Sequence, residues 1–136
     1  MKLMSWNIHG CNHQRKLKTL ARKIKQEKPN VLFLQESKCN SETMEKFSQR
    51  IWKGCKVVAK NASGMASGLV VLWQPHVVQL SDWRANSFSI SSNFSILGSG
   101  VKGTVVNVYG LSAFPQKQSF IIFCYGWLSR LLLALR

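Results

Sequence analysis

A basic amphipathic helix between two short apolar runs constrains the fold of this chain more than any other feature. From Gln14 to Lys28 the apolar residues recur at the spacing of one buried helical stripe, and they are Leu17, Leu20, Ala21 and Ile24. Residues Lys2–Ile8 precede this segment and Val31–Gln35 follow it, and both have the length and composition of buried strands. Two neighbouring parallel strands joined by a right-handed helical crossover are therefore predicted.

The remaining pattern extends this unit into one α/β domain. A second helix face is marked by Met44, Phe47, Ser48 and Ile51. Further strands are predicted at Val57–Ala59, Leu69–Trp73, Val77–Leu80 and Lys102–Tyr109, with short strands and turns over residues 81–100. The 136 residues, 46% of them hydrophobic, suffice for one buried core. The order of elements predicts an α/β fold with a mixed sheet.

The last residues differ from the rest. The stretch "FIIFCYGWLSRLLLAL", from Phe120 to Leu135, is apolar on every side except at Gly126, Ser129 and Arg130. A membrane anchor is one reading, but the stretch is shorter than the roughly 20 apolar residues that a spanning helix needs and contains an arginine. We expect no integral membrane span. Residues 1–118 are predicted to form the folded domain and residues 119–136 an apolar helical tail.

The charge is strongly basic and concentrated in the amino-terminal half. The formal net charge is +14, and residues 1–60 hold fourteen Lys and Arg against four Glu. Nucleic acid is the first candidate partner, a membrane surface the second, and a merely solvated basic surface the third. The residues predicted to contact phosphates lie on the first helix: Lys16, Lys18, Arg22, Lys23 and Lys25.

The cysteines favour a reducing compartment. Cys11, Cys39, Cys55 and Cys124 form no CxxC pair, and no signal peptide is recognisable at the start of the chain. Free thiols and an intracellular location, nuclear or cytoplasmic, are expected.

Three predicted strands end on polar residues that could bind a ligand or take part in catalysis. Asn7 follows Trp6, Glu36 follows "VLFLQ", and Tyr109 follows "VVNV". Parallel pairing of the first two strands would bring Asn7 and Glu36 to one edge of the sheet. Each residue also has an ordinary reading: an exposed carboxylate for Glu36, a turn-initiating side chain for Asn7, and an aromatic at the rim of the core for Tyr109.

Four segments in order resemble a known family. "SWNIHG" at 5–10, "VLFLQESK" at 31–38, "SGLVVLW" at 67–73 and "VNVYG" at 106–110 are similar to the successive amino-terminal motifs of the endonuclease/exonuclease/phosphatase superfamily. Within that superfamily the chain most resembles the endonuclease domain of plant non-LTR retrotransposons. The resemblance covers residues 1 to about 118, which corresponds to the amino-terminal portion only.

The resemblance implies a fold and a chemistry. The fold would be a truncated deoxyribonuclease-like sandwich of mixed β-sheets with outer helices. The activity would be Mg²⁺-dependent hydrolysis of phosphodiester bonds in nucleic acid, with DNA as the expected substrate. By position, Glu36 matches the metal-binding glutamate, Asn7 matches the asparagine that helps to hold the metal and the phosphate, and Tyr109 matches the tyrosine that contacts the scissile phosphate.

The departures from the family limit the expected activity. The Gly-Asp-x-Asn and Ser-Asp-His motifs are absent, and neither Asp82, the single aspartate, nor the three histidines His9, His13 and His76 stand in their place. Little or no turnover is expected, because no residue is identified that would activate water. The alternatives are a non-catalytic nucleic-acid-binding remnant of a retrotransposon and a non-functional fragment.

Two further expectations concern the first turn and the sheet surface. The pattern formed by His9, Cys11 and His13 could suggest a transition-metal site, but an exposed loop is the expectation for such spacing in a turn. A sheet face left uncovered by a missing half would promote self-association.

Overall fold

The computed structural model describes residues 1–11, 13–61, 68–86, 89–109, 118–125 and 132–135. The described residues form helices α1 (Gln14–Glu27) and α2 (Ser41–Ile51). One sheet has five strands, in the order β3 (Lys56–Lys60), β4 (Leu69–Trp73), β2 (Val31–Gln35), β1 (Lys2–Asn7) and β9 (Leu132–Leu135). The other has four strands, in the order β5 (Val78–Ala85), β6 (Ser89–Ile96), β7 (Lys102–Tyr109) and β8 (Gln118–Tyr125).

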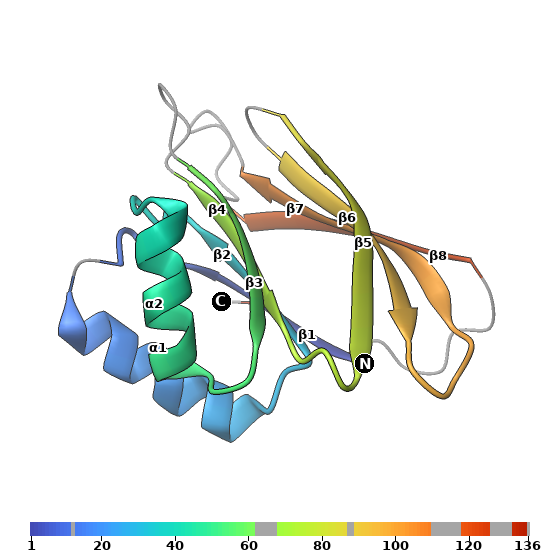
Figure 1. Ribbon diagram of the computed structural model, residues 1–136, viewed down its shortest axis with the longest axis horizontal. Coiled ribbons are helices and arrows are strands. Elements are labelled where there is room, and N and C mark those ends of the chain that lie inside the picture. The colour runs from blue at the N-terminus through green and yellow to red at the C-terminus, as the bar shows by residue number, and fades with distance from the viewer. Residues whose placement is uncertain (12, 62–67, 87–88, 110–117, 126–131, 136) are drawn as a thin grey trace.

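The layers are stacked as a sandwich with helices on one outer side. Figure 1 shows α1 and α2 against one face of the five-stranded sheet and the four-stranded sheet against its other face. In the five-stranded sheet, β1 pairs in parallel with β2 and β9, whereas β4 is antiparallel to both β2 and β3. The four-stranded sheet is antiparallel throughout its described strands. The predicted α/β sandwich of sheets with outer helices is confirmed.

The central strands β2 and β4 of the five-stranded sheet are buried on both faces. Every residue of β2 and of β4 is buried, as expected for strands covered on both sides. On the helix side the core includes Leu20, Ile24, Met44, Ile51, Leu32, Leu34, Val70 and Leu72. Between the sheets it includes Val31, Phe33, Val71, Val78, Leu80, Ile90, Phe94 and Val105. The two sheets therefore cover each other within this chain.

Local chemistry accounts for the start of α2 and the end of α1. Asn40 caps α2 by accepting a hydrogen bond from the Thr43 amide at 2.8 Å. The left-handed Lys28, whose amide bonds to the Ile24 carbonyl, ends α1 directly before Pro29. The predicted helix over Gln14–Lys28 is confirmed to within one residue.

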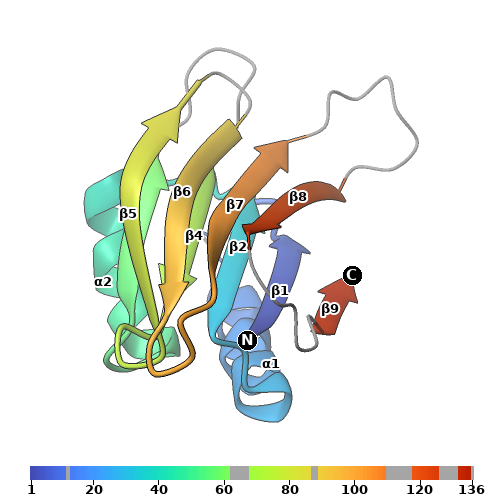
Figure 2. The same cartoon turned by 90° about the vertical axis from the view of Figure 1, so that its right-hand side faces the viewer.

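The apolar tail is not helical where the structure describes it, so the helix predicted for residues 119–136 is wrong. Gln118–Tyr125 forms β8 and pairs with β7, and Leu132–Leu135 forms β9 at the edge of β1. Figure 2 shows each strand beside its neighbour. An apolar run with so few polar positions cannot be assigned by periodicity, and the segment Phe120–Tyr125 is rich in β-branched and aromatic residues, which favour strands.

The inner and outer faces of the sandwich differ in the side chains that they carry. The inner sheet faces are covered by one another, and the outer face of the four-stranded sheet carries polar side chains such as Ser81, Asn93 and Thr104. Self-association through an uncovered face therefore stays a prediction. Within the described ranges, no helix has the length and apolar character to cross a membrane.

Candidate active site

The parallel pairing of β1 with β2 brings two strand ends together. Asn7 lies opposite Gln35, the last residue of β2, so Glu36 is the first residue after that strand. The pairing continues past the strands, because the Gly10 amide donates to the Glu36 carbonyl at 2.6 Å and the Cys11 amide to the Ser37 carbonyl at 2.9 Å. The loop after β1 is thereby held against the loop after β2, and the expected meeting of Asn7 and Glu36 at one edge is found.

His9 joins these two residues. Its Nδ1 lies 2.6 Å from Glu36 Oε2, and its backbone amide donates to Asn7 Oδ1 at 3.2 Å. The Glu36 side chain is only 11% exposed, whereas that of His9 is 57% exposed. The carboxylate is thus largely withdrawn from solvent, and the imidazole covers it from the solvent side.

The backbone at this point is in an uncommon conformation. His9 and Glu36 both have positive φ, 50° and 54°. Left-handed backbone is unfavourable for residues other than glycine, and such residues gather at functional sites where the surrounding structure holds them. Here the hydrogen bonds between the two loops hold them and direct both side chains to the same place.

Asn7 carries an unused donor. The residue is 7% exposed, and Nδ2 has no hydrogen-bond partner among the described residues. A buried amide hydrogen without a partner costs free energy, about 1–3 kcal/mol. The donor is therefore a candidate contact for a bound anion such as phosphate.

The donor set suits magnesium rather than a transition metal. Mg²⁺ binds through one or two carboxylates and completes its shell with water and substrate oxygens, and Glu36 with the Asn7 amide oxygen provides such ligands. No group of three or more His, Cys, Asp or Glu that could hold a metal occurs in the described part of the chain. Cys11 is fully buried with its thiol directed to Met44 Sδ at 3.5 Å, so it does not share a metal site with His9 and His13.

Burial keeps the thiols of Cys11 and Cys55 protonated. Burial raises the pKa of the Cys11 thiol to about 12, with the neighbouring Cys39 adding to the effect. Burial also raises the pKa of the Cys55 thiol. Cys11, Cys39 and Cys55 form no disulfide among the described residues, as the sequence predicts, and Cys11 and Cys55 serve as small apolar core residues.

Tyr109, the third predicted residue, is the last residue of β7. Figure 2 shows β1 and β7 running in the same direction, so Tyr109 ends its strand on the side where β1 ends. The Tyr109 side chain is outside the described part of the structure, and its predicted contact with phosphate is untested.

Gln35 and Asn107 form a buried polar bridge between the sheets that sequence reasoning missed. Gln35 Nε2 donates to Asn107 Oδ1 at 2.7 Å and to Ser5 Oγ at 2.9 Å. Asn107 Nδ2 lies within hydrogen-bond distance of the Leu34 carbonyl, at 3.2 Å, and of the Val70 carbonyl, at 3.1 Å. The bridge fixes the end of β2 immediately before Glu36. The available signal was one amide in each of the apolar strands "VLFLQ" and "VVNV".

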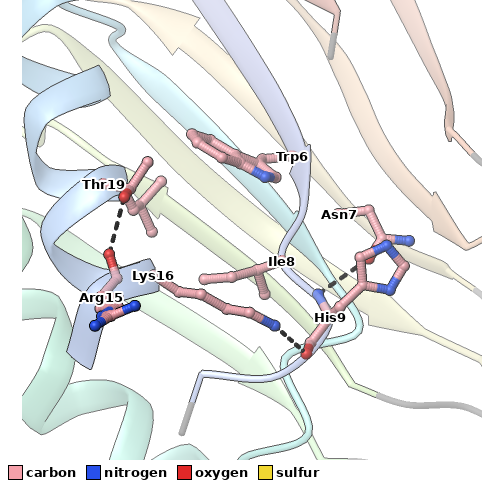
Figure 3. A pocket seen from close by; sticks show the side chains of 8 residues that line it. Trp6, Asn7, Ile8, His9, Arg15, Lys16 and Thr19 are labelled. Carbon is pink, nitrogen blue, oxygen red and sulfur yellow. Dashed lines mark hydrogen bonds between the residues drawn. The ribbon is translucent and has the colours of Figure 1, made fainter. Parts of the chain in front are cut away.

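The basic helix residues divide into two groups. Lys16 is half-buried, and its Nζ donates to the His9 carbonyl at 2.7 Å, which ties α1 to the site loop (Figure 3). Lys23 is also half-buried. Lys18, Arg22 and Lys25 are exposed and share one helix face. The structure thus leaves these three available to a polyanion.

The sequence as a whole matches one family. The profile of the endonuclease/exonuclease/phosphatase family matches residues 4–130. The chain belongs to this family. The match runs beyond residue 118, the limit expected from the motifs, and so includes β8. No curated protein sequence matches the chain.

Several solved structures share the fold of this chain. The D. rerio protein TDP2 complexed with a single-strand DNA product has a TM-score of 0.59 at 16% identity, covering 84% of this chain and 47% of that one. The human Nocturnin catalytic domain with a bound sulfate anion gives 0.57 at 16%, covering 76% and 47%. A Bacteroides thetaiotaomicron member of the family gives 0.56 at 7%, covering 75% and 47%. The chain therefore spans about half the length of these solved structures.

Proposed function

We propose that this chain carries part of a Mg²⁺-dependent phosphodiester hydrolase acting on nucleic acid, and that the chain as given has little or no turnover. The observation that carries the proposal is the buried Glu36 carboxylate, held against His9 and beside Asn7 in a member of this family. The similar TDP2 structure contains a single-strand DNA product, which supports DNA as the substrate.

In this proposal the residues of the chain hold and orient the phosphate. Glu36 and Asn7 would hold Mg²⁺, which when bound stabilises negative charge on phosphate oxygens. The unpartnered Asn7 Nδ2 would donate to a phosphate oxygen, and Tyr109 would contact the scissile phosphate. Asp82 takes no part, because it lies exposed on β5 and accepts a hydrogen bond from Asn93 at 3.1 Å. Low turnover follows because no second carboxylate is identified to orient the attacking water.

The first prediction concerns Mg²⁺ binding at Glu36. Addition of Mg²⁺ is expected to raise the melting temperature of the purified chain, because a ligand that binds only the folded state stabilises it by about 2.7 kcal/mol at one hundred times its dissociation constant. The Glu36→Gln variant should lose this response because the amide removes the anionic ligand. Thermal unfolding with Mg²⁺ or with EDTA measures the difference.

The control is Glu42→Gln, which removes an exposed carboxylate of α2 that pairs with Lys46 at 3.0 Å. This variant should keep the full Mg²⁺ response. Supercoiled plasmid incubated with Mg²⁺ tests turnover in the same preparations. Nicking that Glu36→Gln abolishes would contradict the proposed inactivity, and an equal Mg²⁺ response in both variants would contradict the metal site.

A non-catalytic nucleic-acid-binding remnant is the second candidate. The observation that favours it is the exposed stripe of Lys18, Arg22 and Lys25 on α1. Such cations contact phosphates without reading sequence, and their binding weakens with salt through counterion release.

The second prediction concerns this stripe. Replacing Lys18, Arg22 and Lys25 together by glutamine should weaken DNA binding and make its salt dependence shallower, by about 0.9 logarithmic units of slope for each phosphate that is no longer neutralised. The control replaces Arg50, Lys53 and Lys56, which are exposed elsewhere on the surface. Fluorescence anisotropy across a salt series measures both. Equal weakening by the two sets would mean that only net charge matters.

The source and location of the chain belong to the same proposal. The segments "SWNIHG" and "VLFLQESK" support descent from the endonuclease domain of a plant non-LTR retrotransposon. A nuclear or cytoplasmic location is consistent with the free thiols and with a DNA partner.

A further inference from the structure

A pocket separates the end of β1 from the first turns of α1. It has a volume of about 290 Å³, and its walls include Trp6, Ile8, Thr19 and Leu20. Figure 3 shows Trp6 and Ile8 projecting from one side of the pocket toward Thr19 and Lys16 on α1. This volume falls just below the roughly 300–1,000 Å³ typical of small-molecule pockets, which suits one planar ring system rather than a larger ligand.

The walls and the mouth of this pocket differ in chemistry. Trp6 is half-buried, so part of its indole faces the space, and Ile8 and Leu20 add apolar surface. Arg15 and Lys16 line the same pocket, and Lys16 Nζ is held at the His9 carbonyl at 2.7 Å. An aromatic wall beside two cations suits a flat aromatic group that carries a negative charge.

The pocket is continuous with the candidate active site. Asn7 and His9 line it and also belong to the cluster around Glu36. A group bound against Trp6 is therefore next to the place where a phosphate would lie.

We propose that the Trp6 pocket holds one unpaired base of a single-stranded nucleic acid, with Arg15 and Lys16 facing the adjoining phosphate. This inference rests on the proposed nucleic-acid function and adds to it a position and a mode of binding. Nucleic acid bases stack on aromatic side chains with little dependence on sequence, and one such contact changes affinity by about tenfold or more.

The test compares two oligonucleotide probes of equal length on the full chain. One is a single strand of thymidines, and the other is the same strand with abasic residues, which keeps the phosphates and removes the rings. The wild-type chain is expected to bind the thymidine strand about ten times more tightly. Intrinsic fluorescence, to which five tryptophans contribute, should be quenched by the thymidine strand in part through Trp6.

Variants assign the difference to the pocket. Trp6→Leu should abolish the tenfold preference, and Trp6→Phe should retain most of it because a ring remains. Thr19→Met narrows the pocket from the α1 side with a residue that favours helices, and it should also reduce the preference. Because this variant leaves Trp6 in place, it tests the pocket even if the Trp6 variants fold poorly. Lys18→Ala removes an exposed cation outside the pocket, so it should weaken both probes equally.

The outcomes separate this inference from the proposed function. If the wild-type chain binds both probes equally, or if Trp6→Leu and Thr19→Met keep the tenfold preference, the pocket does not hold a base, although nucleic-acid binding stands. If the chain binds neither probe, the proposed function and the base site are both wrong.

Discussion

Replacing Asn107 with leucine is expected to lower the free energy of unfolding by about 3 kcal/mol, the largest effect that we expect from one side chain at the sheet interface. Asn107 is fully buried, and its amide is within hydrogen-bond distance of Gln35 Nε2, the Leu34 carbonyl and the Val70 carbonyl. Leucine has a similar size but cannot replace these hydrogen bonds. Buried polar groups on three partners would then each be left with one hydrogen bond fewer.

Asn93→Leu is the matched control for this prediction. Asn93 lies on the neighbouring strand β6, directly opposite Thr104, and its amide is exposed on the outer face of the sheet. Its hydrogen bonds to Asp82 and Thr104 are open to solvent, so the same substitution there should cost no more than about 0.5 kcal/mol. Chemical denaturation measures both variants. A similar small loss at both positions would show that the polar bridge does not hold the sheets together.

Replacing Gly68 with alanine is expected to lower the free energy of unfolding by about 3 kcal/mol. Gly68 has a φ of 95°, and a Cβ atom there would lie 2.3 Å from Ser37 Oγ, closer than any real contact. The strand-end loop that carries Glu36 would have to move, because the Ser37 amide also bonds to the Gly68 carbonyl at 3.3 Å. We therefore expect this variant to lose its Mg²⁺ response together with its stability.

Gly54→Ala separates the two causes. Gly54 also has a positive φ, 81°, but nothing lies within 4 Å of a Cβ atom placed there. Only the backbone conformation is penalised, so the loss should be about 1 kcal/mol and the Mg²⁺ response should stay intact. An equal loss of unfolding free energy in both variants would mean that the loop containing Ser37 moves away from the added Cβ atom without an energetic penalty.

The position of the candidate site could be predicted because its main determinants are local. The apolar runs Lys2–Ile8 and Val31–Gln35 and the helical period between them identify a parallel strand pair, and parallel strands place Asn7 and Glu36 at one edge. Once the parallel strands are identified in the sequence, the residues that meet at their carboxyl ends can be predicted.

The contacts that complete the site could not be predicted in the same way. His9 reaches Glu36 across 27 positions of sequence, and Asn107 reaches Gln35 across 72. A histidine at position 9 is compatible with an ordinary exposed loop, and an asparagine at position 107 with an ordinary strand. The residues next to them in the sequence do not predict which distant side chain each one contacts.

The tail shows the same limit for secondary structure. Its apolar residues carry no period of two or of 3.6, so the run from Phe120 to Leu135 reads equally well as a buried helix or as buried strands. Pairing decides between them, because β7 and β1 each offer an edge with unpaired backbone groups that β8 and β9 occupy.

Periodicity and composition were enough to predict the strand–helix–strand unit, the basic face of α1 and the residue types at the strand ends, because both act over a few neighbouring residues. Three features emerge only when the chain is folded: His9 lies against Glu36, Asn107 joins the two sheets, and a pocket opens beside Trp6. These features depend on side chains far apart in sequence meeting in a close-packed interior, where burial makes each polar contact or its absence cost free energy.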